Sequence, residues 1–221
     1  VCTYNIGYDG RDTWGLSAAQ RSARILAQLH ERGAEIVALQ EVIHRGDMAE
    51  VGAFSASMPG WYSYTEPHNQ TNHYSNMILS VFPIVQGSER TQTIVSHNGR
   101  NDRVNISVQL RTPLGVLRVW SIHTRFEEPG DGCLQLFRGV RLVAESEPQT
   151  PYIIMGDYNT QRKNVLSIAK SVGLTAHDAT NVGRIDHILT SDPLEVVAQE
   201  CIARPIVPGE HDPIFAEIGA N

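Results

Sequence analysis

The chain lacks the features that would place it in several large classes of protein. It has no run of lysine or arginine, and its formal net charge is −6 with neutral histidines. Proteins that coat or bend nucleic acid depend on a basic face, so this composition argues against a non-specific coating or architectural role. The argument has less force against an enzyme, because a bound metal ion can supply positive charge locally.

Long hydrophobic runs and closely paired cysteines are also missing. The longest apolar runs, residues 36–39 and 152–155, are far shorter than the ~20 residues of a membrane-spanning helix. The three cysteines, Cys2, Cys133 and Cys201, form no C-x-x-C pair, which argues against a zinc ribbon or a thioredoxin-like site. We expect three reduced, mostly buried thiols rather than one disulfide with a thiol left over.

The chain starts at Val1 without an initiator Met, a basic segment or a signal-type apolar segment. Either a secreted chain after processing or a trimmed domain accounts for this start, and the compartment stays open. No repeat, low-complexity tract or linker divides the sequence. We therefore predict one domain over residues 1–221, acting as a monomer.

The order of the predicted elements indicates the fold class. Ser17 and Gln20 fit a capping box at the start of the first helix, and Gly33 fits its end. Helices that flank antiparallel runs of strands, in two halves of the chain, predict an α/β fold with two packed sheets and helices outside them. The predicted helices are residues 17–32, 47–58, 132–147 and 164–172, and the predicted strands are residues 1–6, 35–42, 61–65, 76–82, 91–96, 104–111, 116–123, 152–157, 185–190, 196–203 and 214–218.

Polar residues stand at the ends of several apolar strands. Strand ends in packed sheets converge on one crevice, so these side chains can meet although they are far apart in sequence. Carboxylate and amide oxygens are hard ligands that suit Mg²⁺ or Mn²⁺ better than zinc, and histidines beside them suit proton transfer and phosphate contact. The residues in such places are Asn5, Glu41, His123, Asp157, Asn159, Asp186 and His211.

Each of these residues also has a purely structural interpretation. Glu41 fits a solvated cap, and Asp157 with Asn159 fits an Asx turn. His123 fits a core histidine with a backbone partner, and the other positions fit caps or ordinary loops. Only the coincidence of all of them favours an active site.

Seven segments, in order along the chain, resemble the motifs of the endonuclease/exonuclease/phosphatase superfamily. This superfamily includes pancreatic-type deoxyribonucleases, abasic-site endonucleases, inositol-polyphosphate phosphatases, neutral sphingomyelinases and the nuclease subunit of cytolethal distending toxins. The resemblance implies a four-layer α/β sandwich, in which two mostly antiparallel packed β-sheets are flanked by helices. The segments are Thr3-Tyr4-Asn5-Ile6, residues 37–42, residues 75–84, Ser121-Ile122-His123-Thr124, Gly156-Asp157-Tyr158-Asn159, residues 184–188 and residues 210–214.

The resemblance also implies a metal ligand and a general base. Glu41 would bind Mg²⁺ or Mn²⁺, with Asn5 assisting directly or through water. His211 would be the general base for water, oriented by Glu210, and Asp157 would position the nucleophile or the metal. Glu210 stands where the family usually has Asp, so this pair is one methylene longer than usual.

Four further residues would contact phosphate or support a residue that does. The resemblance implies that Asn159 holds phosphate oxygens and that His123 contacts a non-bridging phosphate oxygen, oriented by Asp186. Arg103 stands just before a strand, where several family members place a phosphate-contacting arginine. The sequence therefore predicts a Mg²⁺-dependent phosphoric ester hydrolase that cleaves a phosphodiester or phosphomonoester by in-line attack of a His-activated water.

Two alternatives remain beside this prediction. One is a metal-dependent nuclease acting on DNA or RNA, and the other is a non-catalytic binding module on the same fold. The substrate classes are a small phosphodiester, a phospholipid head group and a nucleic acid. Glu127, Glu128 and Asp131 in the segment 125–132 would repel a polyanion unless turned away, which favours a small or exposed phosphodiester over duplex DNA.

Overall fold

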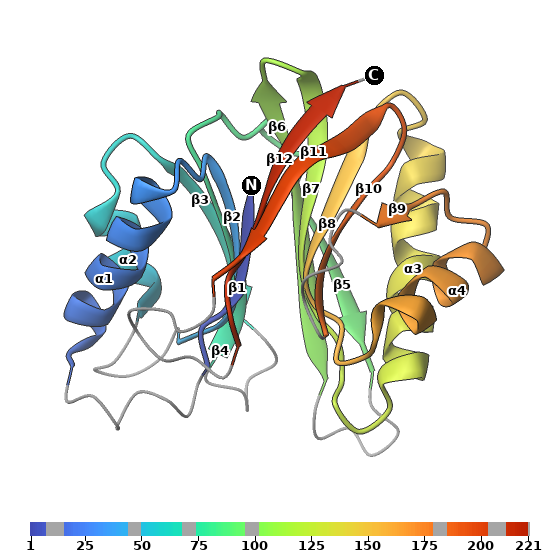
Figure 1. Ribbon diagram of the computed structural model, residues 1–221, viewed down its shortest axis with the longest axis horizontal. Coiled ribbons are helices and arrows are strands. Elements are labelled where there is room, and N and C mark those ends of the chain that lie inside the picture. The colour runs from blue at the N-terminus through green and yellow to red at the C-terminus, as the bar shows by residue number, and fades with distance from the viewer. Residues whose placement is uncertain are drawn as a thin grey trace.

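The computed structural model describes residues 1–7, 16–43, 50–67, 74–95, 102–178, 185–202 and 211–220. Within these ranges the chain forms two six-stranded sheets that pack face to face, with helices on the outer faces (Figure 1). The first sheet contains, in spatial order, β11 (Leu194–Cys201), β12 (Ile214–Ala220), β1 (Cys2–Asn5), β2 (Ile36–Ile43), β4 (Tyr74–Ser80) and β3 (Tyr62–Pro67). The second contains β5 (Arg90–Ile94), β6 (Arg103–Thr112), β7 (Gly115–His123), β8 (Tyr152–Asp157), β10 (Asp186–Thr190) and β9 (His177–Asp178).

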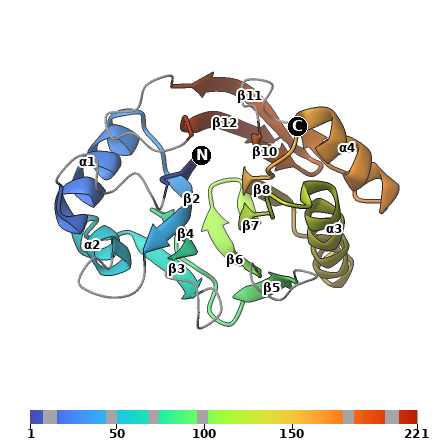
Figure 2. The same cartoon turned by 90° about the horizontal axis from the view of Figure 1, so that it is seen from below.

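Helices complete the four layers. Figure 2 shows helices outside the first sheet and further helices outside the second. No described helix is long and apolar enough to cross a membrane. The helices are α1 (Ala18–Glu31), α2 (Glu50–Ser57), α3 (Pro129–Ser146) and α4 (Arg162–Ser171).

Strand β2 shows why the central strands are apolar on both faces. Val37 and Leu39 pack into the cluster shared with α1, whereas Ile36 and Ala38 pack into the core between the two sheets. Each such residue is almost fully buried, and burial of a large apolar side chain contributes about 1.5–3 kcal/mol relative to exposure. A sheet covered on both faces therefore needs continuous apolar strands, as the sequence predicts.

The predicted elements agree with the structure apart from their limits. Helix α1 begins after Ser17, whose Oγ accepts a hydrogen bond from Gln20 N at 3.2 Å, and Gly33 follows it with φ of 68°. Helix α3 begins at Pro129 rather than residue 132, because proline is tolerated in a first turn, where its missing N–H has no helical partner. The short strand β9 was not predicted, and the predicted elements at residues 47–49, 96 and 203 lie outside the described residues.

The cysteines carry no disulfide. Cys2 and Cys133 are buried, Cys201 is partly buried, and all three are free thiols. Burial raises the pKa of the Cys133 thiol to about 12, so this residue is an unreactive thiol of the core.

Two parallel strand pairs decide where the polar residues meet. β1 runs parallel to β2, so Asn5 lies opposite Gln40, and β7 runs parallel to β8, so His123 lies opposite Asp157. Every other strand pair described is antiparallel. Parallel neighbours end at the same edge, and both sheets therefore present their polar strand ends at one end of the sandwich.

Candidate active site

Asn5 connects the two sheets at this end of the sandwich. Its Nδ2 donates to Asp157 Oδ2 at 3.1 Å, across from β1 to β8, and lies 3.5 Å from Glu41 Oε1. Its Oδ1 accepts a hydrogen bond from Gly7 N at 3.1 Å. With its oxygen engaged by the backbone, the amide presents its nitrogen to the two carboxylates. Asn5 in this orientation holds the carboxylates in place by donating hydrogen bonds to them.

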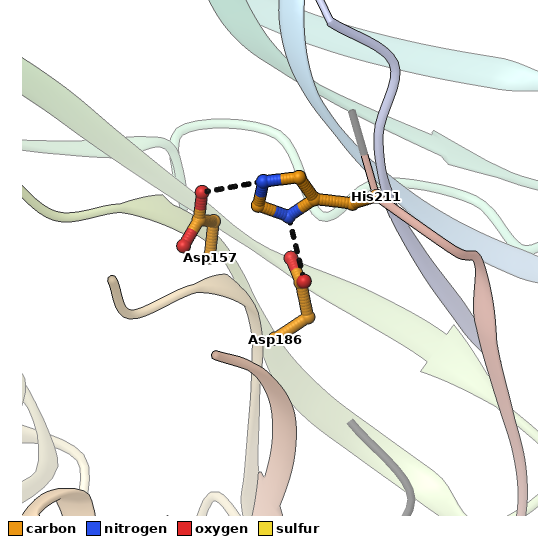
Figure 3. A group of neighbouring side chains, drawn as sticks. All are labelled: Asp157, Asp186 and His211. Carbon is orange, nitrogen blue, oxygen red and sulfur yellow. Dashed lines mark hydrogen bonds and ion pairs between the residues drawn. The ribbon is translucent and has the colours of Figure 1, made fainter. Parts of the chain in front are cut away.

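Asp157, His211 and Asp186 form an acid–histidine row (Figure 3). His211 Nδ1 lies 2.7 Å from Asp186 Oδ2, and His211 Nε2 lies 3.8 Å from Asp157 Oδ2. The two aspartates are register partners on β8 and β10 of the second sheet, whereas His211 precedes β12 of the first sheet. The row is therefore assembled only when the two sheets pack together.

Burial and mutual charge shift the pKa values within the row. Burial raises the pKa of Asp157 to about 7, and the charge of Asp186 adds to this effect, while His211 and the hydrogen bonds from Asn159 and Asn5 oppose it. Burial alone would lower the pKa of His211, but the hydrogen bond to Asp186 and the nearby carboxylates outweigh it and raise this pKa to about 9. Both pKa values in the row are therefore shifted by burial and by neighbouring charges, which is a common feature of functional sites.

The segment around Asp157 is both a turn and a part of the cluster. Asp157 Oδ1 accepts a hydrogen bond from Asn159 N at 2.7 Å, which is the Asx turn expected from the residue types. Asn159 has φ of 50°, and its Nδ2 donates to Thr124 O at 3.0 Å. Gly156 is required before Asp157, because a Cβ there would lie 2.0 Å from Ile122 O. The turn fixes Asp157, and the other carboxylate oxygen faces Asn5 and the histidines.

His123 lies beside the same carboxylates. Its Nε2 is 3.6 Å from Asp157 Oδ2 and 3.9 Å from Glu41 Oε1. The prediction that Asp186 orients His123 is wrong, since Asp186 hydrogen-bonds to His211 instead. The sheet order explains the difference, because β8 lies between β7, which carries His123, and β10, which carries Asp186.

Asn105, which the sequence motifs did not indicate, supports His123. Asn105 is fully buried on β6, and its Oδ1 accepts a hydrogen bond from His123 N at 2.7 Å. An asparagine flanked by apolar residues inside a predicted strand was the available signal. A buried amide at such a place needs a partner, and here the partner is the backbone of His123.

Arg103 begins β6 at the same end of the sandwich. Its guanidinium carbon lies 5.0 Å from the ring centroid of Tyr74, within the range of a cation–π contact. Its Nε and Nη1 are buried and have no hydrogen-bond partner among the described residues. Burial lowers the pKa of Arg103, whereas the charges of Glu41, Glu127 and Asp157 raise it. The site therefore contains a guanidinium with donor atoms that the described part of the chain leaves without acceptors.

Comparison with known proteins identifies the family. Residues 2–208 match the Endonuclease/Exonuclease/phosphatase family. The chain belongs to this family. The resemblance to this family and the expected four-layer sandwich are both confirmed. The family consists of phosphoric ester hydrolases, including phosphatases and nucleases, and its members generally use divalent metals.

Solved structures of the family share the fold at low sequence identity. An endonuclease/exonuclease/phosphatase from Bacteroides vulgatus has a TM-score of 0.80 and 16% identity, and the match covers 100% of this chain and 98% of that one. A mannosyl-6-phosphatase from Bacteroides thetaiotaomicron has a TM-score of 0.75 and 15% identity, covering 99% and 98%. The human Nocturnin catalytic domain with bound sulfate has a TM-score of 0.73 and 15% identity, covering 100% and 94%. No curated protein matches significantly in sequence.

The donor set of the site fits a divalent cation of the kind that endonuclease/exonuclease/phosphatase proteins use. Glu41, Asp157 and Asp186 supply carboxylate oxygens, which are hard ligands suited to Mg²⁺ or Mn²⁺. One ligand atom each from Asp157, Asp186 and His211 lies within 4.8 Å of the others. The raised pKa of Asp157 shows that its negative charge is costly in this buried place, and a cation would offset that cost.

Most of the predicted site residues of this family member lie together in the structure. The structure brings together Asn5, Glu41, His123, Asp157, Asp186 and His211, with Arg103 and Asn159 at the edge of the group. Glu210, predicted to orient His211, lies outside the described residues. Among the described residues the partner of His211 Nδ1 is Asp186.

A cavity of about 630 Å³ lies at the other end of the sandwich and carries none of these groups. Its lining includes Val1, Ile36 and Leu117, which lie near the starts of β1, β2 and β7. None of the predicted site residues lines it. The predicted site residues of this family member therefore lie at the strand ends, away from this cavity.

Proposed function

We propose that the chain is a Mg²⁺- or Mn²⁺-dependent phosphoesterase that hydrolyses a phosphodiester or phosphomonoester by attack of a water molecule activated by His211. The observation that carries the proposal is the acid–histidine row beside Glu41 and Asn5, at the edge of which Arg103 lies. Family membership supports phosphoric ester hydrolysis in general. The row supports the more specific assignment of His211 as the base.

His211 is placed to accept the proton of the attacking water at Nε2. Its Nδ1 is held by Asp186 at 2.7 Å, so Asp186 fixes the ring and stabilises the imidazolium that forms. In the attack a water oxygen forms a bond to phosphorus, the bond from phosphorus to the leaving oxygen breaks, and the water proton passes to Nε2. A positioned base of this kind contributes typically ~10²–10⁴-fold to the rate.

Glu41 and Asp157 are the residues proposed to hold the cation. Asn5 donates hydrogen bonds toward both carboxylates and so keeps them at their separation. A bound divalent cation supplies charge stabilisation for phosphoryl and leaving oxygens. Its charge would also offset the carboxylates that raise the pKa of His211 to about 9, so that His211 is neutral and can act as a base near pH 7.

Arg103, His123 and Asn159 are proposed to hold the phosphate oxygens. Two buried donor atoms of Arg103 have no acceptor among the described residues, which suits a bound oxyanion. His123 Nε2 points at the carboxylate pair, within 3.9 Å of Glu41 Oε1. The sulfate in Nocturnin and the phosphatase activity named for the Bacteroides thetaiotaomicron protein support an oxyanion site in this fold.

The charges around the site favour a small phosphoester over duplex DNA. Glu128 and Asp131 are partly neutralised by Arg125, at 2.7 and 3.1 Å, while the charge of Glu127 acts on Arg103. An acidic neighbour of the phosphate-binding arginine disfavours a polyanion. We also propose that the protein acts as a monomer.

A substrate panel tests the proposal against its two alternatives. Purified protein is assayed on bis-p-nitrophenyl phosphate, a sugar phosphate, phosphoinositides, sphingomyelin, plasmid DNA and RNA, with Mg²⁺, with Mn²⁺ and with EDTA. We expect metal-dependent turnover of a small phosphoester that is lost in Asp157→Ala and His211→Ala while both variants remain folded. Turnover of DNA or RNA alone would establish the nuclease alternative. Absence of turnover on every substrate would leave the binding module as the better interpretation.

A further inference from the structure

A buried ion pair lies behind the site, between the first sheet and its two helices. Arg21 of α1 and Glu50 of α2 are 3% and 1% exposed, and Arg21 Nη1 lies 2.7 Å from Glu50 Oε1. Neither residue belongs to the motifs that indicate the function. Both belong to helices that pack side by side on the outer face of the first sheet (Figure 2).

The pair makes its further hydrogen bonds to the backbone where two strands end. Arg21 Nη2 donates to Ile6 O and to Gly7 O, the latter at 2.8 Å. Glu50 Oε2 accepts a hydrogen bond from Ile43 N at 3.2 Å. Ile6 directly follows Asn5 at the end of β1, and Ile43 ends β2 two residues after Glu41.

The backbone held in this way has a conformation that needs support. Glu41 has φ of 62°, and the register of β2 against β4 shifts between Leu39 and Val42. A non-glycine residue in the left-handed region persists when its surroundings hold it there. On the other strand, Gly7 with φ of 68° donates its N–H to Asn5 Oδ1 and thereby fixes the amide. The ion pair thus anchors the chain next to both residues.

General stability is a poor explanation for a pair of this kind. Taking two charges out of water costs much of what their attraction returns, and apolar replacement of a buried pair is often neutral or stabilising. Holding several backbone groups in fixed places is something that an apolar pair cannot do. Arg21 offers a planar fork of donors, and Glu50 offers two acceptor oxygens.

We propose that Arg21 and Glu50 are positioning residues that hold Asn5 and Glu41 in register for cation binding, although neither touches the cation. The proposal rests on the proposed function, because it assigns the cation to Glu41 and its neighbours. Residues that orient metal ligands without contacting the metal typically change metal affinity 10- to 100-fold when they are replaced.

The test uses two variants and a matched control. The double variant Arg21→Met/Glu50→Leu removes both charges together and leaves no unpaired buried charge, while Arg21→Lys keeps the charge but loses the fork. The control is Arg118→Met/Glu147→Leu. Arg118 Nε lies 2.6 Å from Glu147 Oε2, and Arg118 is 3% exposed, like Arg21. Arg118 lies on β7, five residues before His123. Binding of Mn²⁺ alone is measured by titration calorimetry or electron paramagnetic resonance, beside urea unfolding in EDTA and the metal dependence of kcat and KM.

The expected result separates positioning from stability. Mn²⁺ affinity should fall about 10- to 100-fold in Arg21→Lys and in the double variant, with a higher metal requirement for turnover, and stay unchanged in the control. Wild-type affinity in a folded Arg21→Lys or double variant would overturn the proposal, and so would an equal loss in the control. If the wild type binds no Mn²⁺, and Glu41→Gln leaves the metal dependence of kcat and KM unchanged, the proposed function itself fails, and the inference fails with it.

Discussion

The stability of the metal-free protein should depend on Asp157 in a way that can be worked out from its surroundings. Burial and the charge of Asp186 raise the pKa of Asp157 from 3.8 to about 7. A carboxyl whose pKa is higher in the folded protein than in the unfolded chain contributes stability below the unfolded value, and this contribution is lost as the pH rises through the folded value. The metal-free protein should therefore lose stability between about pH 4 and about pH 7.

Asp157→Asn removes this pH-dependent cost. A shift of about three pKa units corresponds to about 4 kcal/mol at most. The variant loses the acceptor for Asn5 Nδ2, which costs about 1 kcal/mol, but keeps an acceptor for Asn159 N. In EDTA at about pH 8 we expect Asp157→Asn to unfold with a free energy about 2–3 kcal/mol above that of the wild type. At about pH 4 the variant should be the less stable by about 1 kcal/mol.

Urea unfolding at both pH values, with EDTA and with Mg²⁺, measures these differences. Mg²⁺ should stabilise the wild type by about 1.4 kcal/mol for each tenfold excess over its dissociation constant, and should leave Asp157→Asn unchanged. Glu147→Gln is the control of opposite sign: burial alone would raise the pKa of Glu147, but hydrogen bonds from Arg118 and Gln109 lower it, so this variant should be destabilised at about pH 8. If Asp157→Asn is no more stable than the wild type there, the reasoning about its buried charge is refuted.

Three further predictions concern catalysis. His211→Gln should lower kcat by about 10²–10⁴-fold without unfolding the protein, because glutamine cannot take up the proton of water; a change below tenfold would exclude His211 as the base. Mg²⁺ should lower the pKa of His211 from about 9, as followed by NMR of the ring protons, and an unchanged pKa would place the cation elsewhere. Arg103→Met should raise KM about 10- to 100-fold and change kcat less, as expected for a charged hydrogen bond worth about 1.5–3 kcal/mol; an unchanged KM would show that Arg103 does not contact substrate.

Local chemistry explains which parts of the site could be predicted from sequence. Gly156 and Asp157 at the end of an apolar strand specify a turn with an inward carboxylate, and the structure has both features. His123 ends its strand in the same way and lies 3.6 Å from Asp157. Strand periodicity and turn residues are encoded within a few positions, so a single sequence reports them directly.

The partners of these residues depend on tertiary arrangement and were harder to predict. Asp186 pairs with His211 because β10 adjoins β8 and β12 brings the histidine from the other sheet, and no local pattern states that order. Arg21 stands in an amphipathic helix, where an arginine normally lies on the solvated face, but here it is buried against Glu50. Long-range pairing of charged groups is decided by the packing of whole elements, which the sequence of one element does not contain.

The predicted site residues come together across the interface of the two sheets. Gln40 of the first sheet donates to Ser121 Oγ of the second at 3.2 Å, and Asn76 of the first donates to Ser121 O at 3.2 Å. These bonds form a buried polar layer that, with the hydrogen bond from Asn5 to Asp157, fixes the separation of the sheets at the end where the row forms. The proposed cation, held from both sheets, would bind only the packed sandwich, so its binding free energy would add to the stability of the whole fold and not to one half. Metal binding should therefore shift a single cooperative unfolding transition rather than protect either sheet alone.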